Sequence, residues 1–332
     1  LRAGLCGTDA DLVAGHYGRA PEGEDFLVLG HESLGRVIEA GANADAVRRG
    51  QLVVTTIRRR GGSEHDRLGR PDLSSDPVFI ESGISGAHGF MASEFVADAR
   101  DLVPVPAELE PVGILTEPLS CITKSLRQAD QVQARLDLWE PTRALVTGAG
   151  TIGLLATLAL RLRGLEVTTC ARRAAPTRNS ELVERLGARY ISTADIELPA
   201  LAERDGPFDI IFEGSGAPSL IEPAVAALAP NGVAALFSVT PGSRPMPVDM
   251  ARLNQALVLY NRVIVGSAAA AWDDYAGAVG TIGQAQADTA THGWLNELIT
   301  DRIAGFDVEA IARHLAGRGD DIKVTVEIAP GP

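Results

Sequence analysis

The pattern of hydrophobic and polar positions divides the chain into two parts. From residue 1 to about 105 the apolar runs are short, as at 26–29, 35–38, 51–57 and 94–97, and Gly, Pro, Asn or Asp separate them. Runs of this length bounded by turn residues are typical of strands. We therefore expect a compact, barrel-like, β-rich unit at the start of the chain.

Beyond Pro118, apolar runs of strand length alternate with runs of helical period. Helices are expected at 122–134, 180–186 and 219–228, and strands at 166–171, 209–212, 233–238 and 262–265. This alternation predicts a doubly wound parallel sheet. The stretch from about residue 270 is helical, ends in an alternating strand at 323–328, and is expected to return to the first domain.

The predicted fold class is therefore α/β, with a Rossmann doubly wound parallel sheet domain and a β-rich catalytic domain. We expect the Rossmann domain at residues 126–269 and the catalytic domain at residues 1–125 and 270–332.

A glycine-rich turn at residues 143–153 (RALVTGAGTIG) joins a β-type run to a helical run. Gly148, Gly150 and Gly153 have the G-x-G-x-x-G spacing, which permits a tight turn, close approach of the backbone to a pyrophosphate and close helix–strand packing. Thr151 and Ile152 begin the helix, whose first amides favour an anion. The alternative is a tight strand–helix turn that binds no ligand, but the flanking strand and helix favour dinucleotide binding.

The end of the next predicted strand indicates which dinucleotide is bound. An acidic residue there would favour NAD through the ribose hydroxyls. Arg172 and Arg173 stand there instead, and guanidinium groups suit a 2′-phosphate. We therefore predict NADP, although both arginines could be ordinary surface cations.

Composition narrows the classes of partner and location. A net charge of −13 argues against nucleic acid and anionic membranes. No apolar run reaches the ~20 residues of a membrane span. The three cysteines are far apart, so we expect a reducing, cytoplasmic location. Because Leu1 lies within a motif, we also expect residues to precede it.

Candidate metal ligands lie in three separate segments: residues 4–9 (GLCGTD), 30–33 (GHES) and 116–118 (TEP). Each segment alone is a weak signal. Together Cys6, His31 and a carboxylate, from Glu32 or Glu117, offer the donor types that zinc accepts in a catalytic site with one open position. Such a zinc would act as a Lewis acid on an alcohol, and Thr8 could relay the proton.

These motifs resemble those of the zinc-dependent medium-chain dehydrogenase/reductase superfamily, in particular the archaeal-type glucose dehydrogenases. GAHGFM at 86–91, LTEPLS at 115–120, APNG at 229–232, NRVIVG at 261–266 and IKVTV at 322–326 support the resemblance, which covers the chain except for its start. It implies that the first domain is GroES-like. It also implies an NADP- and zinc-dependent oxidoreductase, in the form of a homodimer or homotetramer.

The resemblance implies a role for each motif residue. Cys6 and His31 would bind zinc, Glu32 would be an alternate or outer ligand, and Glu117 would be the remaining ligand or would hold metal-bound water and the sugar. Thr8 and Glu94 would contact substrate hydroxyls. The pyrophosphate would lie along Gly150 to Gly153, and the 2′-phosphate at Arg172 and Arg173. The nicotinamide side would be lined by Phe237, Ser238, Val239 and Ser267, with Lys323 nearby. Glu94 could instead be a solvated residue, and Lys323 an edge-strand charge.

The chain departs from that family in two places. Residues 58–75 contain no cysteine, which excludes the four-cysteine structural zinc of many relatives, so we predict one zinc per chain and solvent-facing Glu64, His65 and Asp66. In the substrate region, relatives tend to present an asparagine shortly after the Val-Gly, where residues 266–271 here read GSAAAA and include the candidate substrate residue Ala269. Cys121 stands where sugar-binding relatives often have a carboxylate. A less polar pocket makes glucose itself doubtful.

The leading hypothesis is hydride transfer between NADP and a secondary alcohol or carbonyl of a small-molecule sugar, polyol or cyclitol. One alternative is a biosynthetic ketone reductase that runs the same chemistry backwards. The other is a zinc-free NADPH-binding sensor or scaffold protein.

Overall fold

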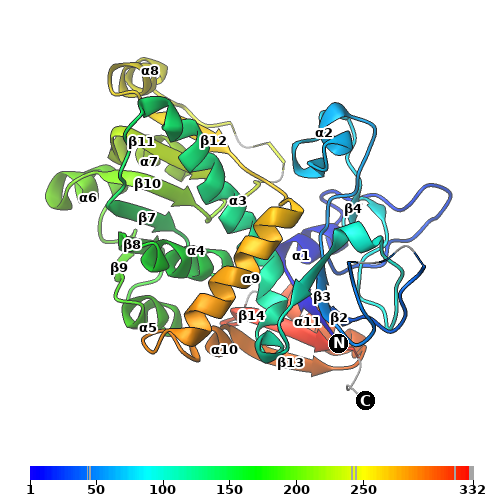
Figure 1. Ribbon diagram of the computed structural model, residues 1–332. Helices are drawn as coiled ribbons and strands as arrows, with labels where there is room; N and C mark the ends of the chain where they lie inside the picture. Colours follow the sequence, from blue (N-terminus) through cyan, green and yellow to red (C-terminus); the bar gives the residue numbers. More distant parts are fainter. Residues whose placement is uncertain (43, 45, 241, 244, 318, 329–332) are drawn as a thin grey trace. The chain divides into compact units, whose positions relative to one another are not determined.

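The computed structural model describes residues 1–42, 44, 46–240, 242–243, 245–317 and 319–328. Within this part, the chain divides into two compact units (Figure 1). Unit 1 contains Leu1–Cys121 and Ala269–Pro332, and unit 2 contains Ile122–Ala268. The divisions thus fall at 121/122 and 268/269, where we had predicted 125/126 and 269/270. The first lies inside helix α3 (Thr116–Gln133).

Unit 1 is built on a six-stranded sheet in the order β13-β14-β1-β2-β3-β6. Its strands are β1 (Arg2–Leu5), β2 (Glu32–Arg36), β3 (Leu52–Thr55), β6 (Leu102–Val105), β13 (Ile299–Ala304) and β14 (Lys323–Glu327), and a small separate pair is formed by β4 (Glu81–Ser82) and β5 (Gly86–Ala87). The helices are α1 (Gly7–Val13), α2 (Glu64–Arg67), α9 (Trp272–Ala287), α10 (Trp294–Leu298) and α11 (Val308–Ala316).

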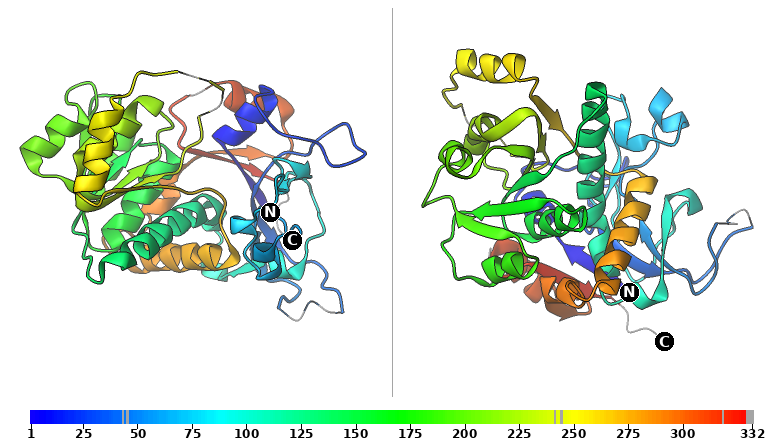
Figure 2. Two further views of the ribbon diagram at one scale, coloured as in Figure 1. Left: turned by 90° about the horizontal axis from the view of Figure 1, so that it is seen from above. Right: turned by 60° about the vertical axis from the view of Figure 1, so that its left-hand side comes forward.

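The C-terminal stretch returns to the first unit, as expected. Strand β14 pairs antiparallel with β1, so Leu5 lies opposite Val324. In Figure 2 the red C-terminal strands accordingly run beside the blue first strand. Val324, Val326, Leu5 and Ile311 share one apolar cluster, which fixes the last strand beside the first.

Unit 2 contains a six-stranded, wholly parallel sheet in the order β12-β11-β10-β7-β8-β9. Its strands are β7 (Arg143–Thr147), β8 (Glu166–Ala171), β9 (Arg189–Ser192), β10 (Phe208–Glu213), β11 (Leu228–Leu236) and β12 (Val263–Gly266). The helices are α4 (Thr151–Leu162), α5 (Arg178–Arg185), α6 (Leu198–Asp205), α7 (Ile221–Ala227) and α8 (Met250–Leu259).

The parallel sheet explains the near-continuous apolar strands of unit 2. Four of the five residues of β7 and five of the six residues of β10 are buried. Strands covered on both faces need apolar side chains at successive positions. This order has its switch point between β7 and β10, and open parallel sheets bind ligands at the carboxyl ends of the strands there.

Two predicted strands of unit 1 are wrong. Residues 26–29 and 94–97 are irregular in the structure. Phe26 is exposed and stacks on His88, and Phe95 packs on Phe90. Their apolar side chains therefore pack on neighbouring aromatic rings without strand pairing.

Candidate active site

Three of the predicted metal-binding residues converge in unit 1. One ligand atom each from Cys6, His31 and Glu32 lies within 4.8 Å of the others. Cys6 caps the start of α1 directly after β1, while His31 and Glu32 stand where β2 begins. The antiparallel pairing of β1 with β2 therefore joins two motifs that are separate in the sequence.

Gly4 provides the space for Glu32. The two residues face each other across the β1–β2 pair. A Cβ atom on Gly4 would lie 1.9 Å from Glu32 Oε2, so any larger side chain would displace this carboxylate. The glycine of the GLCGTD motif is therefore a steric requirement of the site.

Asp9 holds two members of the set in place. Its Oδ2 accepts a hydrogen bond from the Cys6 amide at 2.9 Å, and its Oδ1 lies 3.4 Å from His31 Nδ1. Burial alone would lower the pKa of His31, but the carboxylate of Asp9, with Cys6, raises this pKa well above its usual range. With Nδ1 directed at Asp9, Nε2 is the nitrogen suited to a metal.

Lys323 forms a buried ion pair with Glu32. Its Nζ donates to Oε1 at 2.6 Å and to Oε2 at 2.8 Å, and also to the carbonyl of Leu5 at 3.0 Å. The resemblance had placed Lys323 near the nicotinamide, and that role stays a prediction. The structure instead gives it a partner 291 positions away in the chain.

Glu117 lies at the start of α3 and is not a member of the three-residue set. It is 6% exposed. Burial raises its pKa to about 7, with a further increase from Glu32 and opposing effects of His31 and Lys323. Cys121 Sγ lies 3.6 Å from Glu117 Oε1. These charges show that Glu117 is an electrostatic neighbour of the set.

Tyr275, which our sequence reasoning missed, belongs to the same surroundings. It is fully buried in α9. Burial, and then the charges of Glu117 and Cys121, raise the pKa of its hydroxyl well above the usual range. A tyrosine within a helical run has no local signal that would have indicated this position.

The remaining predicted substrate residues differ in their surroundings. Thr8 is half-buried, with Oγ1 3.8 Å from Cys6 Sγ, whereas Glu94 is exposed. Ala269 has a φ angle of +52°, in the left-handed region that alanine rarely adopts. Their contact with a substrate stays a prediction.

The donor set fits a zinc ion. Zinc binds thiolate, imidazole and carboxylate ligands at about 2.0–2.3 Å, so ligand atoms grouped within 4.8 Å need to move little to surround it. Asp9, whose Oδ1 lies 3.4 Å from His31 Nδ1, supplies the outer carboxylate that typically stands beside a metal-binding histidine. Among the described residues no second such group of His, Cys, Asp and Glu converges.

Asp66, which we expected to face solvent, is buried, so that expectation is wrong. It is 3% exposed, and its Oδ2 accepts hydrogen bonds from Ser63 N, Ser63 Oγ and Ser74 Oγ at 3.0, 2.6 and 2.7 Å. Glu64, on the same helix α2, is exposed as predicted. The cysteine-free lobe at residues 58–75 is thus organised around a carboxylate.

The glycine turn of unit 2 has the geometry that a pyrophosphate site needs. Gly148 has a φ angle of +93°. A Cβ atom on Gly153 would lie 1.9 Å from Gly148 O, whereas one on Gly150 would meet nothing within 4 Å. Thr151 and Ile152 begin α4 at this point. The turn therefore combines close helix–strand packing with open space before the helix amides.

Arg172 and Arg173 follow β8 directly, and both are exposed. Their backbone is anchored, because Ser192 Oγ donates to Arg172 O at 3.1 Å and Tyr190 OH donates to Arg173 O at 2.7 Å. A fixed backbone with exposed guanidinium groups fits a phosphate partner.

Phe237, Ser238 and Val239 follow β11, and buried Ser267 follows β12. Both segments continue from strands of the parallel sheet at their carboxyl ends, where the loops of such a sheet bind ligands.

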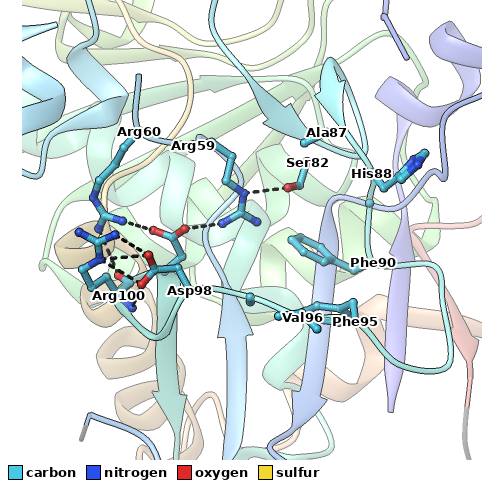
Figure 3. Close-up of a pocket in the computed structure, with 13 residues that line it drawn as sticks. Arg59, Arg60, Ser82, Ala87, His88, Phe90, Phe95, Val96, Asp98 and Arg100 are labelled. Carbon is cyan, nitrogen blue, oxygen red and sulfur yellow. Dashed lines mark hydrogen bonds and ion pairs between the residues drawn. The ribbon is translucent and has the colours of Figure 1, made fainter. Parts of the chain in front are cut away.

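A separate cavity of about 600 Å³ lies in unit 1 and contains none of the predicted site residues. Figure 3 shows its arginines and the neighbouring rings of Phe90 and Phe95. Arg59 and Arg60 donate to Asp101 at 2.6 and 2.7 Å, and Arg100 donates to Asp98 at 2.5 Å. The two aspartates largely neutralise the cavity, so its charge indicates no particular ligand.

Two family models match the chain. The alcohol dehydrogenase GroES-like domain matches residues 1–107, and the glucose dehydrogenase C-terminus matches residues 110–328.

Individual proteins match over almost the whole length. The chain is 37% identical to a glucose 1-dehydrogenase of Methanocella arvoryzae over 330 residues, and 37% identical to that of Thermoproteus tenax over 329 residues. Each match covers 99% of this chain and 90% of the relative. A Haloferax mediterranei glucose dehydrogenase, solved in complex with NADP, Zn and gluconolactone, superposes with a TM-score of 0.91 at 31% identity, covering 100% of this chain and 91% of that chain.

Proposed function

This chain belongs to the glucose dehydrogenase family of zinc-dependent medium-chain alcohol dehydrogenases, and we propose that it oxidises a sugar with NADP as hydride acceptor. The observation that carries the proposal is the convergence of Cys6, His31 and Glu32 in unit 1. Unit 2 of the same chain has the glycine turn and paired arginines that suit NADP.

In this proposal zinc is bound by Cys6 and His31 with Glu117 as the remaining direct ligand, and Glu32, the carboxylate of the converging set, is the alternate or outer ligand. Both oxygens of Glu32 accept hydrogen bonds from Lys323, which supports an outer role. Bound zinc would supply a Lewis acid that eases deprotonation of a substrate hydroxyl. Asp9 orients His31 for this purpose.

Thr8 and Glu94 handle the substrate in this proposal. The half-buried hydroxyl of Thr8, 3.8 Å from Cys6 Sγ, takes the proton of the reacting hydroxyl and passes it outward. Glu94, which is exposed, accepts hydrogen bonds from further sugar hydroxyls. Cys121 and Ala269 offer weaker hydrogen bonding than a carboxylate and an amide would, so a deoxy-sugar or cyclitol fits at least as well as glucose.

On the nucleotide side, Arg172 and Arg173 bind the 2′-phosphate and Gly148 to Gly153 the pyrophosphate. Phe237, Ser238, Val239 and Ser267 flank the nicotinamide. Exposed guanidinium groups on an anchored backbone support the first assignment, and open space at Gly150 supports the second.

We also propose that the chain forms a homodimer or homotetramer. Among the described residues, strand β12 pairs with β11 alone and forms an edge of the sheet. Helix α8 has no buried residue, and Val258, Leu259 and Tyr260 at its end are exposed. An uncovered sheet edge beside apolar side chains favours association with a second copy.

A cytoplasmic location is part of the proposal, and three free cysteines support it. No helix in the described part of the chain combines the length and the apolar character needed to cross a membrane.

A substrate panel tests the proposed activity. Purified protein is incubated with NADP⁺ and, in turn, glucose, other aldoses, deoxy-sugars and cyclitols, and NADPH is followed by its absorbance. We expect turnover with at least one sugar, loss of turnover after dialysis against a chelator, and recovery on addition of Zn²⁺. Absence of NADPH formation with every sugar, although zinc and NADP⁺ are bound, would contradict the proposed activity.

A further inference from the structure

Glu213 is a buried carboxylate at the switch point of the unit 2 sheet. It ends β10 next to Thr147, the last residue of β7, and is 3% exposed. Its Oε1 accepts hydrogen bonds from Ser215 N at 2.8 Å, Ser215 Oγ at 2.5 Å, Gly216 N at 3.1 Å and Thr147 Oγ1 at 3.1 Å. All four donors are neutral groups, so no cation offsets the charge of the carboxylate through these bonds.

These hydrogen bonds fix the loop at residues 214–217 (GSGA) against the glycine turn. A Cβ atom on Gly148 would lie 3.1 Å from Gly214 O and 3.3 Å from Ser215 Cα, so the two backbones are in close contact. The amide of Gly214 also donates to Thr147 O at 3.1 Å. The position of the predicted pyrophosphate turn therefore depends on the loop that Glu213 holds.

The other side of the same loop touches the predicted nicotinamide segment. Thr240 Oγ1 donates to Gly216 O at 2.9 Å. The backbone oxygen of Glu213 accepts from the amides of Phe237 and Ser238 at 3.1 and 3.4 Å. Glu213 thus connects the ends of β7 and β10, which flank the switch point, with the end of the neighbouring strand β11.

From these contacts we propose that Glu213 is a positioning residue for the nucleotide loops and that its negative charge favours NADP⁺ over NADPH. The inference rests on the proposed use of NADP. The oxidised nicotinamide ring carries a positive charge that the reduced ring lacks. The backbone oxygen of Glu213 holds the nicotinamide segment, so the buried carboxylate of the same residue stabilises the oxidised form selectively, because its charge is poorly screened by solvent.

The test compares the dissociation constants of NADP⁺ and NADPH for the wild type and for Glu213→Gln. Tryptophan quenching reports NADP⁺, and the fluorescence of NADPH reports the reduced form. Glutamine keeps an acceptor oxygen for the loop but removes the charge. We expect the preference for NADP⁺ relative to NADPH to fall about tenfold, the order expected for one poorly screened charge. An equal change in both dissociation constants would overturn the role of the charge.

Two variants separate charge from position. Ser215→Ala removes one donor, the hydroxyl, but keeps the backbone amide and the charge of Glu213, and Thr240→Val loosens the opposite side of the loop. Both should weaken NADP⁺ and NADPH binding by the same factor. If either variant shifted the preference as strongly as Glu213→Gln, the effect would belong to loop position and the assignment to charge would be wrong. If neither weakened binding at all, the positioning role would be wrong.

If Glu213→Gln does not fold, Thr147→Val provides the test, because it keeps the charge with one donor fewer. The preference for NADP⁺ should then be kept or increased, and a decrease would overturn the proposal. Failure of the proposed function gives a different result, since the wild type itself would then bind neither nucleotide.

Discussion

At the scale of single residues, Ala269 is the clearest conflict between side chain and backbone. Its φ angle of +52° lies in the left-handed region. For most residues this conformation costs roughly 1–2 kcal/mol, whereas asparagine tolerates it. An asparagine would also add a hydrogen-bonding amide to the region that the resemblance assigns to the substrate, so one substitution should affect both stability and substrate choice.

We therefore expect Ala269→Asn to raise the free energy of unfolding by roughly 1 kcal/mol. The new amide should also increase kcat/KM for glucose by about two- to tenfold, the range of one neutral hydrogen bond. Thermal melts and the substrate panel measure these effects. Ala268→Asn is the matched control, because Ala268 is not among the residues with positive φ. Loss of stability together with unchanged glucose turnover would contradict this account of Ala269.

The paired arginines after β8 give a second prediction at this scale. Charge-assisted hydrogen bonds contribute about 1.5–3 kcal/mol each. Replacing Arg172 and Arg173 together by alanine should thus weaken NADP⁺ binding by about a hundredfold or more, and NAD⁺ binding hardly at all. Fluorescence titrations with both nucleotides measure the effect, with the exposed Arg163→Ala as control. An equal loss for NAD⁺ would mean that the pair does not bind the 2′-phosphate.

The sequence was sufficient to predict those site residues whose side chains have a distinctive chemistry. Cys6 and His31 stand in motifs that predict metal binding, and the structure brings them together. The pair of Lys323 with Glu32, and the position of Tyr275 beside Glu117, had no such signal. These contacts join segments that are distant in the sequence, and the first of them arises because β14 and β2 pair with opposite sides of β1.

At the scale of elements, the lobe at residues 58–75 shows how a carboxylate can organise a segment without cysteines. Burial would raise the pKa of Asp66, but hydrogen bonds from Ser63, Gly61 and Ser74 hold this pKa well below its usual range. A lowered pKa in the folded state means that the charged carboxylate stabilises the fold at pH values above the pKa of the unfolded state, which is near 3.9. That stabilisation is lost as the pH falls towards the folded value.

Asp66→Asn should therefore lower the free energy of unfolding at neutral pH by about 1–3 kcal/mol. The difference from the wild type should shrink as the pH falls below about 4, where the wild-type carboxylate begins to lose its advantage. Melting temperatures across this pH range measure the effect. Glu64→Gln, on the same short helix but exposed, should be neutral at every pH. A difference that does not depend on pH would show that charge is unimportant there.

Elements were predicted well where their pattern was periodic and less well where it was not. The strand expected at 166–171 matches β8 residue for residue, because the β-branched Val167, Thr168 and Thr169 follow one another and favour extended backbone. Residues 26–29 and 94–97 have similar composition but form no strand. Their side chains pack on aromatic neighbours that lie elsewhere in the sequence, which local patterns do not encode.

At the scale of the whole molecule, the uncovered sheet edge of unit 2 is the surface at which we expect two copies of the chain to associate. If β12 and the end of α8 form the contact between copies, a charge placed there should separate them. We expect Val258→Glu with Leu259→Glu to shift the mass measured by light scattering to that of a smaller species. The control is the double variant Val13→Glu with Leu68→Glu, because both side chains are exposed in unit 1. An unchanged mass for the α8 variant would place the interface elsewhere.

The central claim is that one chain holds both a catalytic zinc and NADP. Elemental analysis of the purified wild type and of Cys6→Ala, with an NADP⁺ titration of each sample, tests it most directly. We expect about one zinc per wild-type chain and nearly none in Cys6→Ala, with NADP⁺ bound by both. A wild type without zinc that added Zn²⁺ cannot restore, but with NADP⁺ still bound, would contradict the account and leave a nucleotide-binding protein without the family's metal chemistry.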